Sequence, residues 1–403
     1  MRPLGRLTLV LTSLSPGCLF GLGIRIADQD PLATARGNAF AATADNPSAI
    51  YYNPAGLSRL EGHNATVGGY GVTLTSTYDS PATTSDVSTE SDFEMLPQVY
   101  YAYSGRAVPL SFGLGLYSPY GLGLEWPENT GFRTLAKEGR IVYLTFNPVV
   151  AWRILPTLSV GAGVTVNWSQ ATLKRGLGFV AGDEFKFKGD DTDVGFNAGV
   201  LWQPHPQHSF GANYRSATTL EFDGESRATL PGFSVSGPAS ARLRFPQHVV
   251  VGWSYRPTTN WNFEVDVDWT DWDSLDTVVL KQRVSGFPAE VPLSFNWRSS
   301  FFYEFGVTRQ FEHKFSVSAG YIYSENSVPD SSFNPVVPDS DRHIFSVGIG
   351  QKYNQLRWDA AYQLAYGPTR TVNNSPISPS GESADGRYEF LSHAFSLSVG
   401  YTF

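Results

Sequence analysis

Hydrophobic and polar residues alternate along most of the chain that follows Gly62. The pattern is cleanest at the C-terminus, in FSLSVGYTF, where Phe, Leu, Val and Tyr alternate with Ser, Gly and Thr. The same alternation recurs in LSVGAGVTVNW (158–168), WNFEVDVDWT (261–270) and LRWDAAYQLAY (356–366). It is typical of β-strands whose two faces meet different surroundings. We therefore predict an all-β protein.

The two faces of these strands differ in an informative way. One face is aliphatic and aromatic, whereas the other is small, polar or charged. The wet face of a soluble sandwich would carry Lys and Glu rather than rows of Trp and Tyr. Aromatic residues near strand ends are typical of the interfacial girdles of outer-membrane barrels. Because a bilayer offers no water to a free strand edge, the sheet must close. The pattern thus predicts a transmembrane antiparallel β-barrel.

The connections between the predicted strands alternate between short and long. Short ones lie near Gly105-Arg106, Leu155-Pro156, 204–207, 256–260, Glu312-His313 and Asn354-Gln355. Long polar ones lie at 80–92, 119–138, 176–192, 222–238, 272–292, 326–341 and 368–387. Short periplasmic turns and long external loops are the barrel pattern, and the segments number about fourteen. Residues 63–403 are therefore expected to form the barrel.

The N-terminal region lacks this alternation. DPLATARGNAFAATAD (30–45) predicts a short helix broken at Gly37, and Pro47 and Pro54 favour turns in the stretch that follows. The lumen of a wide barrel is the available place for its apolar residues, so we expect residues 24–62 to form a plug, here called the hatch. Residues 1–23, with Arg2, Arg6 and a short apolar core, are expected to be a signal peptide.

Composition narrows the functional classes. Charged residues make up only 16%, aromatic residues 14%, and the formal net charge is −8. Without clustered Lys and Arg, nucleic-acid binding is not expected. The single cysteine, Cys18, lies in the expected leader, the seven His lack metal spacing, and no Gly-x-Ser-x-Gly elbow is present. We expect no enzyme activity, no metal and no cofactor.

Three stretches resemble a known family. ARGNAFAATADNPSAIYYNPAGLSRLEG (35–62) is similar to the hatch of the FadL/TodX outer-membrane transporters of hydrophobic compounds. YSPYGLGLEWPENTGFRT (117–134) and FNPVVAWRILPTLSVGAGV (146–164) resemble the third external loop and the fourth and fifth strands of that family. The terminal Phe403 resembles the signal read by barrel-insertion machinery. The resemblance implies a monomer of fourteen strands in the bacterial outer membrane, surrounded by lipid bilayer and lipopolysaccharide.

The resemblance also implies a function. A hydrophobic compound, in the first place a long-chain fatty acid, would be captured by the external loops and pass into a lumenal pocket. It would leave sideways through the wall after the hatch rearranges. Uptake of aromatic hydrocarbons by the same route and a general aqueous porin are alternatives, and a structural barrel and an outer-membrane lipase stay open as well.

Candidate site residues follow from the resemblance and from the pattern. Asn53-Pro54-Ala55 matches a family motif that gates, although such a tripeptide also suits an ordinary turn; Arg36 and Gly37 complete the gating set. For ligand binding the resemblance implies Arg175, as the partner of a carboxylate, together with the hatch residues Phe40 and Tyr51. An exposed apolar capture groove is expected from Tyr117, Tyr120, Leu122, Leu124, Trp126 and Phe132, with loop-to-loop packing as the alternative.

Arginines on the inward face of the strands could either pair with acids or bind ligand. Arg175, Arg215, Arg298 and Arg357 share the inward phase, and each is expected to pair with an inward acid unless it binds ligand. The inward acids are Glu264, Asp266, Asp268, Glu304 and Asp359. Gly113, Gly115 and Pro119 make a kink plausible in the third strand, where the family has a gap in its wall.

Overall fold

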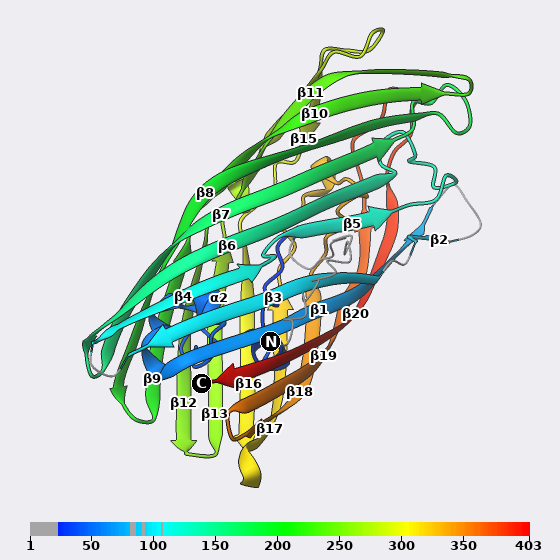
Figure 1. Ribbon diagram of the computed structural model, residues 1–403. Coiled ribbons are helices and arrows are strands. Elements are labelled where there is room, and N and C mark those ends of the chain that lie inside the picture. The colour runs from blue at the N-terminus through cyan, green and yellow to red at the C-terminus, as the bar shows by residue number, and fades with distance from the viewer. Residues whose placement is uncertain (1–22, 81–85, 91–92, 106–107) are drawn as a thin grey trace, which may run out of the picture.

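The computed structural model describes residues 23–80, 86–90, 93–105 and 108–403. Nearly all of the expected signal peptide therefore lies outside the described residues. The chain forms a closed antiparallel β-barrel of fourteen strands with a small helical segment inside (Figure 1). The fold class predicted from the alternation is confirmed.

The barrel closes between its first and last strands. β1 (Gly62–Asp79) pairs with β20 (Gly386–Thr402) from Asn64 opposite Thr402 to Asp79 opposite Arg387. The strands between them are β3 (Phe93–Ser104), β4 (Leu110–Tyr117), β6 (Glu138–Leu155), β7 (Leu158–Arg175), β8 (Glu184–His205), β9 (His208–Arg215), β12 (His248–Thr258), β13 (Trp261–Thr270), β16 (Ser300–Gln310), β17 (Phe315–Ser324), β18 (Arg342–Tyr353) and β19 (Leu356–Val372). This closure pairs the edge strands that lipid could not hydrogen-bond.

Several barrel strands are interrupted and then continue as separate segments. β5 (Gly121–Glu125) continues β4, β10 (Thr218–Leu230) continues β9, and β14 (Thr277–Gln282) continues β13; β11 (Phe233–Phe245) leads into β12 and β15 (Glu290–Ser294) into β16. A two-residue strand, β2 (Val87–Ser88), pairs with β1. Short 3₁₀ turns are η2 (Trp272–Ser274), η3 (Glu312–Lys314) and η4 (Asp330–Ser332).

The alternation seen in the sequence separates the outer and inner faces of the wall. In β20, Phe395 and Leu397 are 61% and 59% exposed, whereas Ser396 and Ser398 are 3% and 4% exposed. The apolar residues point outward, where lipid replaces water as their surroundings, and the small polar residues point into the lumen.

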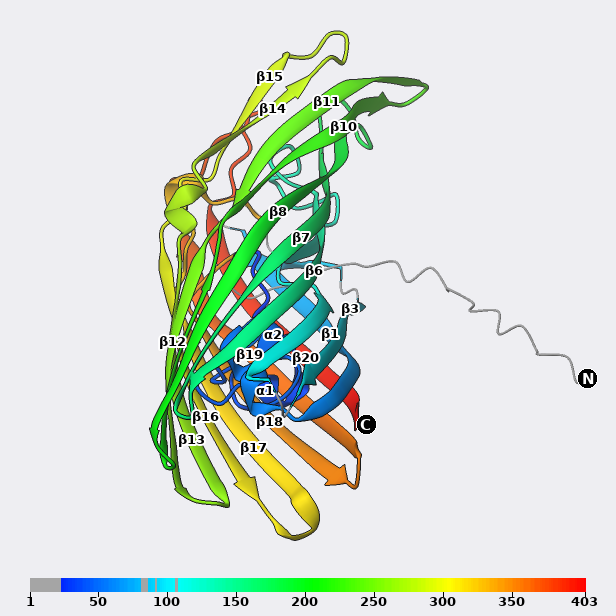
Figure 2. The same cartoon turned by 60° about the vertical axis from the view of Figure 1, so that its left-hand side comes forward.

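Several expected external loops are partly strand. Region 222–238 is spanned by β10 and β11, which meet in a tight turn at Pro231-Gly232, and region 272–292 contains η2, β14 and β15. β8 already begins at Glu184, so the loop expected at 176–192 is shorter. Figure 2 shows β10, β11, β14 and β15 extending beyond the other strands at one end of the barrel. Strands that extend past the membrane-spanning part of a barrel need no apolar outward face, so their sequence does not alternate clearly. The expectation of loops in these regions was wrong.

The hatch fills the lumen nearer the end with the short turns (Figure 2). It contains α1 (Pro31–Ala35), α2 (Ala49–Tyr52) and the 3₁₀ helix η1 (Pro54–Arg59). The Asp30 side chain caps α1 by accepting from the backbone N–H groups of Leu32 and Ala33, and Pro31 suits the first helical position. The helix is shorter than predicted and ends before Gly37. Gly62, the last residue of the hatch, is already the first residue of β1.

The described helices are all short. None of them is long and apolar enough to cross a bilayer.

Candidate functional site

The hatch backbone approaches the wall closely because glycines of the wall face it. A Cβ placed on Gly211 would lie 2.0 Å from the carbonyl oxygen of Ala41, and one on Gly320 would lie 2.0 Å from the nitrogen of Gly37. A Cβ on Gly161 would lie 2.5 Å from the carbonyl carbon of Pro54. Distances this short exclude any side chain. The small residues that permit close packing are therefore in the wall as well as in the hatch.

Gly37 itself is required by its backbone conformation. Its φ is +60°, in the left-handed region that favours glycine, and a Cβ there would lie 2.8 Å from the nitrogen of Tyr321. The predicted break at Gly37 thus coincides with the point where the hatch turns against β17.

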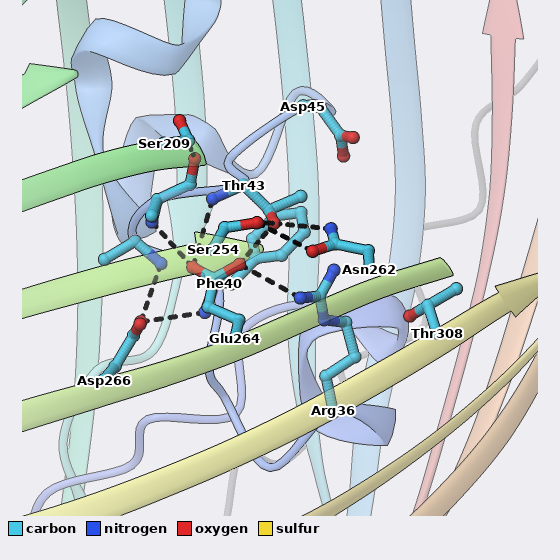
Figure 3. Close-up of polar contacts among 12 residues, drawn as sticks. Arg36, Phe40, Thr43, Asp45, Ser209, Ser254, Asn262, Glu264, Asp266 and Thr308 are labelled. Carbon is cyan, nitrogen blue, oxygen red and sulfur yellow. Dashed lines mark hydrogen bonds and ion pairs between the residues drawn. The ribbon is translucent and has the colours of Figure 1, made fainter. Parts of the chain in front are cut away.

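Three buried carboxylates on β13 hold the hatch; we call Glu264, Asp266 and Asp268 the β13 carboxylates. Asp266 Oδ2 accepts hydrogen bonds from the backbone N–H groups of Phe40, at 2.9 Å, and Ala41, at 2.8 Å. Glu264 Oε1 accepts from the backbone N–H groups of Ala42, at 2.7 Å, and Thr43, at 3.1 Å. Figure 3 shows Glu264 and Asp266 on the wall strand pointing at the hatch segment.

Two hatch arginines complete this attachment. Arg36 Nη2 lies 3.0 Å from Glu264 Oε2. Arg25 binds Asp268 through two parallel hydrogen bonds, Nη1 to Oδ1 at 2.8 Å and Nη2 to Oδ2 at 2.6 Å. All four side chains are at most 2% exposed. Breaking a buried pair leaves an uncompensated charge, at a cost of about 3–5 kcal/mol.

The arginines of the wall pair differently from the expectation. Arg357 does pair with an inward acid, Asp359, with Nη2 donating to Oδ1 at 2.8 Å. Arg298 follows β15, outside the strands, and is exposed, so its inward assignment was wrong. Arg215 forms no ion pair with any acid in the described part of the chain; its guanidinium lies over the rings of Tyr51 and Tyr117. The β13 carboxylates instead bind backbone N–H groups and arginines of the hatch.

Asn53 joins two parts of the hatch to the wall. Its Nδ2 donates to the carbonyl oxygens of Ala41, at 2.7 Å, and of Val200 in β8, at 2.9 Å, and its Oδ1 accepts from the N–H of Ala55. The following residue, Pro54, begins η1. The Asn53-Pro54-Ala55 tripeptide is thus a helix start that is also bonded to the barrel, which an ordinary turn would not require.

The third barrel strand is broken where the sequence suggested a kink. β4 ends at Tyr117, β5 begins at Gly121, and Pro119 lies between them. β4 pairs with both β3 and β6, whereas in the described part of the sheet β5 pairs with β6 alone. The upper part of β3, residues 93–98, pairs on its other side with β1. An unpaired interval therefore separates β3 from β5.

The first residues of the hatch close this interval. The N–H of Ile26 donates to the carbonyl oxygen of Pro119, and the N–H of Gly121 to that of Ile24, both at 2.8 Å. Gln98 of β3 donates from Nε2 to the carbonyl oxygen of Asp28 at 2.9 Å. Hatch residues 24–28 thus bridge β3 and β5. Sequence reasoning did not find this strap, because the strap residues themselves take part only through backbone atoms.

The six apolar residues expected to form an exposed capture groove are buried. Tyr117 and Phe132 are 0% exposed, and Tyr120, Leu122, Leu124 and Trp126 are at most 5% exposed. Trp126 packs edge-on against Phe132 and donates from Nε1 to the carbonyl oxygen of Pro335 in another external loop. Their burial matches loop-to-loop packing rather than an exposed surface, and binding of a ligand by these residues stays a prediction. Loop aromatic residues attract one another as well as ligands, and the sequence does not separate the two.

These loop residues are continuous with the hatch. The same apolar cluster includes Ile24 and Ile26 of the hatch, Tyr120 and Trp126. An apolar interior therefore runs from the external loops to the strap at the break in the third strand.

The remaining predicted ligand residues lie in two places. Phe40 and Tyr51 are buried in the hatch, with Tyr51 edge-on to Tyr117 at 5.3 Å between ring centres. Arg175 lies at the end of β7, half-buried, with its guanidinium carbon 5.5 Å from the ring centre of Phe185. Arg175 is therefore near the external end of the barrel, whereas Tyr51 and Tyr117 meet at the hatch.

Besides the strap, sequence reasoning missed the attachment of the hatch through Arg25 and the β13 carboxylates. Arg25 lies at the edge of the expected leader, and no pattern singled it out. The run EVDVD (264–268) did carry a signal, because acids on three successive inward positions of one strand need partners that the strand itself does not supply. No cluster of metal-ligating side chains is found within residues 23–80, 86–90, 93–105 and 108–403.

A closed membrane barrel with a plug fastened in its lumen and an apolar interior above it defines an outer-membrane transport channel. Residues 21–403 match the model of the outer membrane protein transport protein family (OMPP1/FadL/TodX), and the chain belongs to this family. Members of the family are outer-membrane transporters of hydrophobic compounds rather than enzymes.

Individual relatives are distant in sequence. The long-chain fatty acid transport protein of Escherichia coli O6:H1 is 20% identical over 63% of this chain and 58% of its own length. The crystal structure of a Pseudomonas aeruginosa FadL homologue is 20% identical, has a TM-score of 0.84 and covers 94% of this chain and 100% of that one. The Pseudomonas putida toluene transporter TodX is 17% identical, with a TM-score of 0.78 and coverage of 95% and 100%. These structures share the fold.

Proposed function

We propose that this protein takes up long-chain fatty acids by diffusion across the outer membrane, with lateral exit through the break in the third barrel strand. The observation that carries the proposal is the strap of hatch residues 24–28, which bridges β3 and β5 at that break. The apolar cluster that begins in the external loops ends at the same strap. A hydrophobic molecule that leaves there enters lipid without crossing water.

The proposed route has three steps. The substrate inserts between the packed external loops around Trp126 and Phe132, and Arg175 at the end of β7 meets its carboxylate. It then moves down the apolar interior to the hatch. Rearrangement of the hatch about Gly37 and Asn53-Pro54-Ala55 withdraws the strap and opens the interval between β3 and β5.

An aqueous porin is a weaker candidate. The two cavities found beside the hatch have volumes of about 10 and 20 Å³, too small for a water-filled pore. Uptake of aromatic hydrocarbons is the alternative function, because a toluene transporter shares the fold.

A reversible cross-link tests the exit. Gln29 Nε2 donates to the carbonyl oxygen of Ser118 at 2.8 Å, so Gln29→Cys with Ser118→Cys places two thiols where the hatch meets the break. The only natural cysteine, Cys18, lies in the expected leader. Joining the thiols with a short bifunctional reagent is expected to stop uptake of labelled palmitate, and reduction is expected to restore it.

The matched control uses Thr77→Cys with Ser88→Cys, whose side-chain oxygens already lie 3.0 Å apart and away from the hatch. Cross-linking this pair is expected to leave palmitate uptake unchanged. Palmitate uptake that continues at the normal rate with the Gln29–Ser118 pair joined would exclude exit through this break. Parallel assays with labelled toluene distinguish the two substrate classes.

A further inference from the structure

Arg215 is a buried cation that forms no ion pair with an acid in the part of the chain that the structure describes. It is the last residue of β9 and is 4% exposed. Its Nε and Nη2 atoms have no hydrogen-bond partner among the described residues. Burying a charge without a paired anion costs free energy. Arg215 therefore lowers the stability of the closed state.

The two free atoms of Arg215 are a matched pair. Nε–H and Nη2–H lie on the same edge of the planar guanidinium and point in parallel. This edge matches the two oxygens of a carboxylate, which it binds through two parallel hydrogen bonds. The free edge therefore has the geometry of a carboxylate site.

Aromatic rings enclose the guanidinium from two elements. Its central carbon lies 5.0 Å from the ring centre of Tyr51 in the hatch and 5.4 Å from that of Tyr117 in β4. Cation–π contacts of this kind offset part of the burial cost. Because one of the two rings belongs to the hatch, movement of α2 uncovers Arg215 to the lumen.

The surroundings of Arg215 are amphipathic. Its cross-strand neighbour His248 has a buried Nδ1 without a partner, and Asn213 has a buried Oδ1 without one, both among the described residues. An aromatic cluster lies next to these polar groups. Its members Tyr120, Tyr143 and Phe245 pack together with ring centres 4.8–5.1 Å apart. Tyr120 donates to the carbonyl oxygen of Pro246, and Tyr143 is bonded to Thr218; these two partners lie just before His248 and just after Arg215 in the chain.

We infer that Arg215 is a second headgroup site, which binds the carboxylate of an amphipathic acid while its hydrocarbon tail lies among Tyr120, Tyr143 and Phe245. The inference rests on the proposed uptake of fatty acids and adds a site at the hatch to the one at Arg175.

The test compares two probes that differ only in the headgroup, dodecanoate and dodecanol, bound to the purified full-length protein. Wild-type protein is expected to bind dodecanoate more tightly than dodecanol. Arg215→Gln should lower the affinity for dodecanoate by about 10- to 100-fold and leave that for dodecanol unchanged. Arg244→Gln, which alters an exposed arginine of β11 on the outer face, is the matched control and should change neither.

Three results would overturn the inference: an unchanged dodecanoate affinity in Arg215→Gln, an equal loss for both probes, or a wild-type protein without preference for the acid. Arg215→Lys keeps the charge but not the parallel pair of donors, and it carries the test if the Gln variant fails to fold. For this variant an intermediate loss confined to dodecanoate is expected, and heat-dependent migration in gels checks folding.

Failure of the inference and failure of the proposed function are distinguishable. Uptake of labelled dodecanoate by cells reports the function, and the ratio of the two affinities reports the site. Uptake of dodecanoate without an Arg215-dependent preference for dodecanoate over dodecanol would contradict the site alone. Arg215-dependent binding of dodecanoate without uptake would contradict the function alone.

Discussion

Single glycines of the wall set how closely the hatch can approach it. Gly211 and Gly320 face hatch backbone atoms at distances where no Cβ fits, and Gly37 supplies the turn on the hatch side. In each case the contacted atom belongs to backbone, which cannot rotate away as the end of a side chain can. The hatch must then shift as a body, because interiors packed this closely do not absorb an added methyl group.

Gly211→Ala is therefore expected to loosen the hatch. The added Cβ meets the carbonyl of Ala41, and overpacking of this kind costs about 1–3 kcal/mol. Limited proteolysis of the hatch in the folded barrel should become faster. Gly400→Ala is the control, because its nearest neighbour is the hydroxyl of Thr66 at 3.1 Å, a side chain away from the hatch. Equal proteolysis rates for the two variants would contradict the role of Gly211.

At the scale of the element, β13 has two functions in one strand. Its outward residues, such as Val265 and Val267, are 38% and 39% exposed and face lipid. Its inward residues are the β13 carboxylates, which bind four hatch N–H groups and two hatch arginines. The period of two in a strand allows one segment to serve both surroundings.

Glu264→Gln is expected to release the hatch segment that contains Ala42 and Thr43. The neutral amide leaves Arg36 unpaired in a buried site, and loss of such a pair costs about 3–5 kcal/mol. Hydrogen exchange at the amides of residues 40–43 should become faster.

Asp359→Asn is the matched control for this experiment. Asp359 is also an inward buried acid, but its hydrogen-bond partner Arg357 lies on its own strand. Exchange at residues 40–43 should stay as in the wild type. Unaltered exchange in Glu264→Gln would mean that the hatch is held by packing alone.

At the scale of the whole molecule, the barrel and the hatch depend on each other. The wall alone would enclose a lumen lined by small and polar residues, and the hatch has few apolar partners other than that wall and the loops above it. Fastening the plug with buried charges, hydrogen bonds and glycine contacts keeps a wide barrel closed. In the proposed route, rearrangement of the hatch exchanges one set of internal contacts for another and needs no energy source.

Deleting residues 24–61, with β1 left intact from Gly62, tests this dependence. We expect the barrel to fold and to conduct ions in a planar bilayer, because the plug no longer fills the lumen. The complete protein should show no steady conductance. If both proteins conduct equally, the hatch does not seal the lumen and the porin alternative gains weight.

The sequence by itself determined the class of fold, the closure of the sheet and the inward and outward faces, because alternation along a strand is a local property set by lipid on one side. The turn prolines and Gly37 marked the hatch, because backbone conformation at such residues is also a local property. Sequence also matched Arg357 with an inward acid, but it assigned Arg298 to the wrong surroundings.

Only the tertiary structure decided which groups meet across the lumen. Partners such as Arg25 and Asp268 are far apart in the chain. The strap at the broken third strand takes part in its hydrogen bonds through backbone atoms, which leave no mark in the residue pattern. The burial of the loop aromatic residues, and the absence of an acid beside Arg215 in the described chain, likewise depend on how distant segments close over one another. The local residue pattern determines which face of a strand meets lipid and which meets the lumen. The closed three-dimensional packing determines which residues those faces contact.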